Sequence, residues 1–152
     1  MFVRLVHIAS FLLVFTGYGS VSAASSARGV SGATSKRIFA IGTACDSPYT
    51  QVETYSLATG NWTPTTSLPW GRDGNAAASA NGKVYTIGGL DMTLREASAA
   101  TEVFVFNKWT SVPTIHLAMP RFEHSACTLH GQIYVTGGFN DSQYPGPAAQ
   151  TL

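Results

Sequence analysis

The residues that could take part in catalysis or metal binding are few and scattered along the chain. Adjacent Glu123 and His124 could supply an acid and a base. Neighbours in sequence need not point the same way on a strand, so we favour a solvated loop. His116, His124 and His130 are separated by 8 and 6 residues, a spacing that brings no compact ligand set together on one helix or strand. We therefore expect no metal site and no cofactor, and we assign no catalytic residue.

Composition limits the classes of protein that the chain can represent. The 152 residues allow one domain. Nine basic and eight acidic residues give a net charge of +1, which argues against a nucleic-acid partner. Charged residues make up 11% against a usual value of roughly 25%, while 45% are hydrophobic. This is the composition of a folded chain, and its 15 glycines and 7 prolines favour short strands and turns.

The first 23 residues have the order of a secretory signal peptide. Arg4 supplies a positive charge, an apolar run extends over 8–15, and the small residues Val21-Ser22-Ala23 precede the expected cut. The run is too short to span a membrane, which takes about 20 residues. We therefore predict a signal peptide over 1–23, a flexible leader over 24–36, and a secreted or periplasmic protein with no membrane span after removal of the signal.

The remaining chain repeats with a period near 48 residues. Three segments share one pattern: 37–43 (RIFAIGT), 83–89 (KVYTIGG) and 132–138 (QIYVTGG). Each unit reads as four short strands, which in the second unit cover roughly 75–80, 83–87, 101–106 and a short piece around Trp109. Asn81-Gly82 suits a two-residue hairpin turn, because both residues accept a positive φ. Residues 92–100 are expected to form a surface loop.

Further markers keep the same order in successive units. They are Arg72 and Arg121, Tyr85 and Tyr134, Gly88-Gly89 and Gly137-Gly138, Glu53 and Glu102, and Trp62 and Trp109. The aromatic positions could stack on sugars, but recurrence in register favours packing between units. For the arginines we favour a structural ion pair or carbonyl bond, with Glu53 or Glu102 as the candidate carboxylate, over an anion clamp.

Cysteine usage adds one expectation. Cys45 and Cys127 are the only thiols, too few for a disulfide framework or a four-cysteine zinc site. Cys127 aligns with Ala78 in a run of small residues. A buried free thiol at Cys127 is therefore favoured over a Cys45–Cys127 bridge.

These markers resemble the kelch repeat, which combines an arginine, a hairpin turn, an aromatic strand ending in Gly-Gly, a glutamate strand and a tryptophan. The resemblance covers 37–152, with a partial repeat over 37–71, a complete one over 72–120 and a partial one over 121–152. It implies an all-β fold of four-stranded antiparallel blades. A kelch propeller usually closes with about five to seven blades. An incomplete propeller is therefore expected, either as a fragment, as a homo-oligomer or complex that closes a ring, or as a small open stack.

The resemblance also implies where a ligand would bind, because kelch domains often use the loop after the arginine at one mouth of the propeller. Asp73, Asn75, Glu123 and His124 occupy those positions and differ between the repeats. Variation fits a binding site, and it also fits unconstrained loops. We predict a binding module for a protein or carbohydrate ligand. The alternatives are a kelch-like sugar enzyme, either a sialic-acid mutarotase or a copper oxidase resembling galactose oxidase, and a truncated frame without function.

Overall fold

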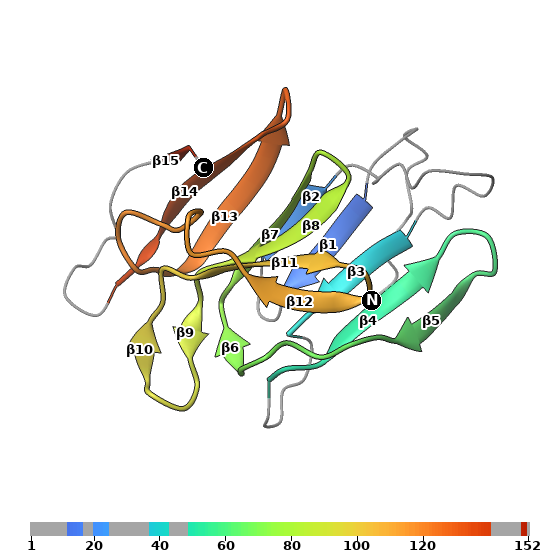
Figure 1. The fold of residues 1–152 in the computed structure, drawn as a ribbon, viewed down its shortest axis with the longest axis horizontal. Helices are drawn as coiled ribbons and strands as arrows, with labels where there is room; N and C mark the ends of the chain where they lie inside the picture. The colour runs from blue at the N-terminus through green and yellow to red at the C-terminus, as the bar shows by residue number, and fades with distance from the viewer. Residues whose placement is uncertain (1–11, 17–19, 25–36, 43–48, 141–149, 152) are drawn as a thin grey trace.

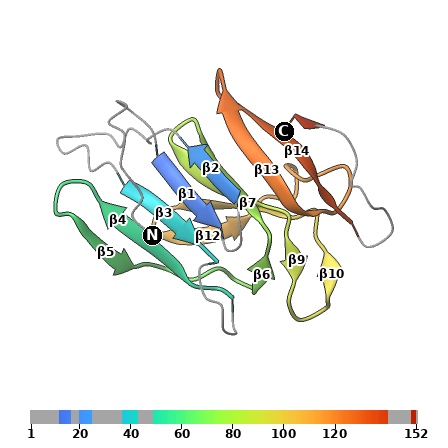
Figure 2. The same ribbon diagram turned by 180° about the vertical axis from the view of Figure 1, so that it is seen from behind.

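The computed structural model describes residues 12–16, 20–24, 37–42, 49–140 and 150–151. These residues form strands arranged in three successive blade-like sheets and one small three-stranded sheet (Figure 1). Seen from behind, the blades again lie side by side with β7 in the middle (Figure 2). In the described part of the chain, no helix is long and apolar enough to cross a membrane.

The second blade contains the four strands that the repeat predicts. They are β7 (Ala76–Ala80), β8 (Lys83–Ile87), β11 (Thr101–Val105) and β12 (Lys108–Ser111). All neighbours are antiparallel, in the order β7-β8-β11-β12. Asn81 and Gly82, with φ of 48° and 77°, form the tight turn between β7 and β8.

The first blade contains β3 (Arg37–Ile41), β4 (Val52–Ser56) and β5 (Asn61–Pro64). The first repeat lacks a strand that corresponds to β7. Strand β1 (Leu12–Thr16) takes this inner position and pairs in parallel with β3. The next strand is β2 (Ser20–Ala24), which also lies against β7. These strands belong mostly to the predicted signal peptide, and its removal stays a prediction.

The third blade contains β13 (Phe122–Leu129), β14 (Gln132–Phe139) and β15 (Gln150–Thr151). The small sheet is built from β6 (Arg72–Asp73), β9 (Leu90–Asp91) and β10 (Glu96–Ala97), in the order β10-β9-β6. The expected loop over 92–100 is therefore partly wrong, because β9 and β10 form a short hairpin that pairs with β6.

Two hydrophobic cores hold the three blades together. The core between the first and second blades consists of Phe39, Ile41, Val52, Leu68, Ala77, Val84 and Trp109. The core between the second and third consists of Ala76, Ala78, Ala80, Ile87, Leu117, Ala126, Ile133 and Val135. Strand β7 contributes alternate alanines to both cores and is buried along its whole length. Small side chains suit this strand because both of its faces are covered at close range.

The two repeated tryptophans lie in different surroundings. Trp109 is 9% exposed, packs against Phe104 at a ring distance of 5.1 Å, and donates its Nε1–H to the Thr66 carbonyl oxygen at 3.0 Å. Phe39 of the first blade meets Phe104 edge-on at 5.2 Å. Trp62 makes the corresponding contact within its own blade, with Tyr55 at 5.3 Å, yet it is 45% exposed. The first blade therefore presents an aromatic face outward.

The outer face of the third blade is also accessible. Tyr134 is half-buried there and Leu129 is 54% exposed. Cys127 is an exposed free thiol, so its predicted burial is wrong. The reason is that alternate side chains of β13 face away from the second blade. The aligned Ala78 is buried because the third blade covers it. Cys45 lies outside the described residues.

Candidate functional site

A buried ion pair fixes the start of the second blade. Arg72, which is 0% exposed, pairs with Glu102, and its Nη1 donates to the Gly88 carbonyl oxygen at 3.0 Å. Its guanidinium carbon lies 3.6 Å from the centroid of the Trp70 ring, close enough for a cation–π contact. The indole Nε1–H donates to Glu102 Oε1 at 3.1 Å. This arginine and glutamate of the repeat thus stabilise the second blade itself.

Burial shifts the titration of both partners in opposite directions. It lowers the pKa of Arg72 to about 10, against the attraction of Glu102, so the guanidinium stays charged at neutral pH. Burial also raises the pKa of Glu102, an effect that the Arg72 cation and the Trp70 hydrogen bond oppose. The pairing compensates charges that would be costly to bury alone.

The third blade repeats part of this arrangement. Arg121 is 2% exposed and donates its Nη1–H to the Gly137 carbonyl oxygen at 3.0 Å, as Arg72 does to Gly88. In the second blade, Glu102 pairs with Thr86. In the third blade, Gln150 pairs with Val135 and so takes the position that corresponds to Glu102. An amide residue therefore stands at the carboxylate position of this blade.

The residues that directly follow the two arginines meet at one end of the blades. Asp73 ends β6, and Glu123 and His124 lie near the start of β13, so a strand stands where a solvated loop was expected. The Glu123 amide donates to the Gly74 carbonyl oxygen at 2.7 Å, and Asp73 Oδ1 accepts from the Gly74 amide at 2.8 Å. Gly74 has a φ of 58°, and a Cβ there would lie 2.9 Å from the Glu123 nitrogen, so only glycine fits. We call the meeting point of Asp73, Gly74 and Glu123 the loop junction. It brings together two carboxylates, the half-buried Asp73 of β6 and the exposed Glu123 of β13.

Asn75 and His124 point into the protein beneath this junction, each about 1% exposed. Asn75 donates its Nδ2–H to Thr86 Oγ1 at 2.8 Å. Val135 occupies the Thr86 position in the third blade, so His124 lacks the corresponding hydroxyl. Burial and the nearby Arg121 charge lower the pKa of His124 to about 4, against the effect of the Ile87 carbonyl, and keep the ring neutral at pH 7.

The structure therefore divides the four predicted binding residues into two pairs. Asp73 and Glu123 lie at the loop junction, whereas Asn75 and His124 are buried. Glu123 and His124 cannot act on a common substrate atom from these positions, because one is exposed and the other is enclosed. Among the described residues, no group of three histidine, cysteine or acidic side chains is placed to hold a metal ion.

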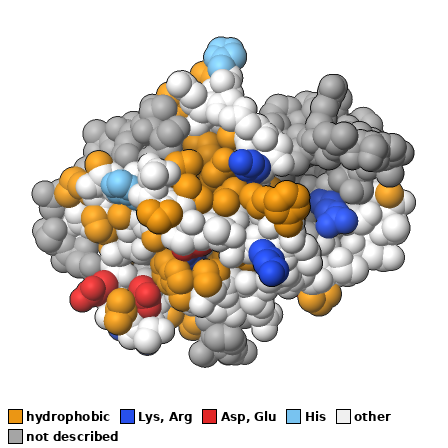
Figure 3. Space-filling view, in the orientation of Figure 1, with side chains coloured by type: hydrophobic (Ala, Val, Ile, Leu, Met, Phe, Trp, Pro, Cys, Tyr) orange, Lys and Arg blue, Asp and Glu red, His pale blue; other side chains and the backbone are white. Residues whose placement is uncertain are grey.

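Figure 3 shows how charge is distributed over one face of the molecule. Acidic side chains gather near the end where β9 and β10 lie, and basic side chains lie further toward the middle and the opposite side (Figures 1 and 3). Strand β6, which contains Asp73, belongs to the same small sheet as β9 and β10. The hairpin of this sheet carries Asp91 and the exposed Glu96, with the exposed Arg95 between them in the turn.

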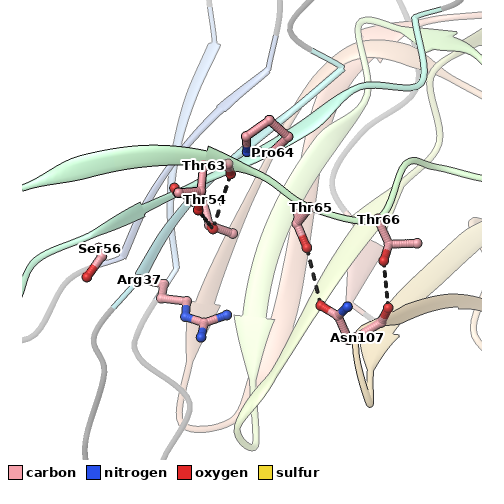
Figure 4. A pocket seen from close by; sticks show the side chains of 8 residues that line it. All are labelled: Arg37, Thr54, Ser56, Thr63, Pro64, Thr65, Thr66 and Asn107. Carbon is pink, nitrogen blue, oxygen red and sulfur yellow. Dashed lines mark hydrogen bonds between the residues drawn. The ribbon is translucent and has the colours of Figure 1, made fainter. Parts of the chain in front are cut away.

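Sequence reasoning missed a polar groove on the outer part of the first two blades. The groove has a volume of about 440 Å³ and lies beside Arg37, Pro64 and Asn107 (Figure 4). Its hydroxyl groups come from Thr54, Ser56, Thr63, Thr65 and Thr66. The only available signal was the unusual density of threonine and serine in and after β4 and β5. Trp70 was missed as well, because the third repeat has Met119 at that place.

Comparisons with known proteins agree with this geometry. A family model described as the Kelch motif matches residues 120–145, which include β13 and β14. The structure of YjhT superposes with a TM-score of 0.53 at 24% identity, over 61% of this chain and 29% of that one. Residues 120–145 of the chain thus match the Kelch motif that the repeated markers resemble. The described residues form part of a kelch-type β-propeller.

Similar proteins come from Limulus polyphemus and Aspergillus terreus. Beta-scruin of Limulus polyphemus is 41% identical over 83 residues, which cover 50% of this chain and 9% of that protein. Alpha-scruin of the same species is 32% identical over 99 residues, covering 60% and 11%. Kelch-like protein terF of Aspergillus terreus is 28% identical over 92 residues, covering 57% and 20%. The chain thus spans between about a tenth and a fifth of the length of these relatives.

Proposed function

We propose that this kelch protein is a secreted or periplasmic binding module whose loop junction holds a protein ligand with a basic segment. The observation that supports this proposal is the hydrogen bond between the Glu123 amide and the Gly74 carbonyl oxygen, at 2.7 Å. It joins the segment that carries Asp73, just before the second blade, to the strand that carries Glu123 in the third blade. Glu123 adopts a φ of 54°, a strained backbone conformation for this residue that favours a functional role at the position.

Charge supports a basic ligand in preference to a neutral one. The two repeated arginines, Arg72 and Arg121, are buried and donate to the carbonyl oxygens of Gly88 and Gly137. The carboxylates of Asp73 and Glu123 are left on the solvent side. Lysine or arginine side chains of a partner could pair with both, with an affinity that falls as salt screens the charges.

The experiment measures binding of synthetic octapeptides of equal length and graded net charge to the full chain. We expect affinity to rise with peptide positive charge and to fall at least tenfold in the double variant Asp73→Asn, Glu123→Gln. Glu53→Gln removes a carboxylate from β4 in the first blade, away from the loop junction. It serves as the matched control and should bind as the wild type does. Equal affinity for basic and neutral peptides would refute the proposal.

Assembly into a larger ring is the second part of this proposed function. A blade buries its apolar faces only between neighbours. The outward aromatic face of the first blade, with Trp62 and Tyr55, supports closure by a homo-oligomer or a partner that supplies further blades. Ring closure would also complete the mouth to which the loop junction belongs.

A further inference from the structure

The polar groove marks a place where the first repeat departs from the second. The repeated aromatic residue pairs with Thr54 in the first blade and with Val103 in the second. Thr54 therefore corresponds to Val103, and Ser56, two residues later, corresponds to Val105. Val103 is buried in the second blade. The first blade thus has hydroxyl groups where the second has valines. Such a change forfeits apolar packing, so it favours a local role that the repeat as a whole does not share.

The far wall of the groove comes from the second blade. Phe106 and Asn107 turn the chain from β11 to β12 with φ of 49° and 60°. Thr66 Oγ1–H donates to the Asn107 carbonyl oxygen at 2.7 Å, and Thr65 Oγ1–H donates to Asn107 Oδ1 at 3.3 Å. Both oxygens of Asn107 are therefore engaged, and its side-chain NH₂ can donate to a ligand. The wall is held in place before any ligand arrives.

One cation faces this collection of neutral polar groups. Arg37 is exposed at the start of β3, and Figure 4 shows its guanidinium pointing toward the side that Asn107 occupies. A guanidinium recognises a carboxylate through two parallel hydrogen bonds. Hydroxyl groups both donate and accept, as the hydroxyls of a sugar do. The volume of about 440 Å³ falls within the range of small-molecule sites, roughly 300–1,000 Å³.

We propose that the groove binds a uronic-acid-containing saccharide, with Arg37 on the sugar carboxylate. The Ser56 hydroxyl and the Asn107 amide donate to the sugar hydroxyls, and the oxygens of Thr65 and Thr66, whose hydrogens are used by Asn107, accept from them. The neighbouring Phe106, 96% exposed, offers an apolar surface for the C–H face of a sugar ring. This site is built from the outer strands of the first two blades. It is separate from the loop junction, and either site can be refuted while the other stands.

The test compares two ligands of the same shape. Trigalacturonate and its methyl ester, which lacks the negative charges, are titrated into the full chain by calorimetry, together with the corresponding triglucuronate. We expect at least one of the two acids to bind and its ester to bind at least tenfold more weakly. Arg37→Gln should remove this preference and leave acid and ester with the same weak affinity.

Two further variants separate a built site from general attraction between charges. Lys83→Gln removes an exposed cation at the position of the second blade that matches Arg37, and it should leave binding unchanged. Ser56→Val introduces the residue type of the second repeat and should weaken acid and ester alike. The proposal is overturned if neither acid binds, if acid and ester bind equally to the wild type, or if Lys83→Gln abolishes the preference as Arg37→Gln does.

Discussion

At the scale of single residues, the position three residues after the repeated arginine holds different chemistry in the two repeats: it is Asn75 in one and His124 in the other. Asn75 bonds to Thr86 in the second blade. His124 takes the same slot in the third blade, where Val135 replaces that hydroxyl. A buried imidazole beside Arg121 is held neutral. Its cost is therefore small at neutral pH and grows when acid would charge it.

The stability of the chain should consequently fall with acidity through His124. The pKa of this ring is about 4 in the folded chain and about 6.5 in the unfolded chain, so the unfolded chain binds the proton more readily. The His124 contribution is complete above pH 6.5 and is lost as the pH falls toward 4. We expect urea unfolding to show a loss of the order of 3 kcal/mol over this window beyond the loss in His124→Asn. Parallel pH profiles for the two proteins would contradict this assignment.

At the scale of elements, the Gly88-Gly89 pair after β8 lets the third blade approach the second. The Gly89 amide donates to the Arg121 carbonyl oxygen at 2.8 Å. A Cβ at Gly88 would lie 2.7 Å from that same oxygen and 2.7 Å from the His124 ring. The matching Gly137 of the third blade has nothing within 4 Å of such a Cβ. The two glycines share a positive φ but differ in their neighbours.

Replacing these two glycines by alanine separates backbone strain from crowding. Both variants place a side chain in the left-handed region, at a cost of about 1–2 kcal/mol. Gly88→Ala adds a clash with the next blade and should lose a further 1–3 kcal/mol or so. Chemical denaturation of the two variants measures the difference. Equal losses would show that the Gly88 backbone does not press on the third blade in solution.

The elements themselves were largely predictable from the repeat. The strands at 76–80, 83–87, 101–105 and 108–111 follow from β-branched and aromatic residues bounded by turn residues, which are local signals. The β9–β10 hairpin was not predicted, because it depends on pairing with β6, a distant part of the chain. The exposure of Cys127 was missed for a similar reason, since an alignment of repeats does not show which faces a neighbour covers. The polar groove joins two blades and has no repeated marker.

At the scale of the whole molecule, the blades bury their shared faces and leave two outer faces accessible. Trp109 and Trp62 hold matching positions, opposite Phe104 and Tyr55 respectively. The first is 9% exposed because the first blade covers it, and the second is 45% exposed. Burial of such an aromatic face is a general driving force for association. The outward face of the first blade is thus where a further blade would add.

Self-association through this face is open to a direct test. We expect the wild-type chain to sediment as an oligomer and Trp62→Ala to shift it to the monomer with little change in the unfolding of the monomer. Trp109→Ala should instead cost about 3–5 kcal/mol of stability, because its ring lies in the core between two blades. A wild-type chain that stays monomeric at high concentration, or a Trp62→Ala variant that still assembles, would rule out this mode of ring closure.

Arg121 takes part in contacts with two neighbouring sheets at once. Its backbone oxygen accepts from Gly89 of the preceding repeat, while its side chain donates to Gly137 of its own. A distortion of one sheet that moves Arg121 would therefore also disturb a hydrogen bond of the other sheet. An insertion that separated Arg121 from β13 would therefore break both links between the second and third blades.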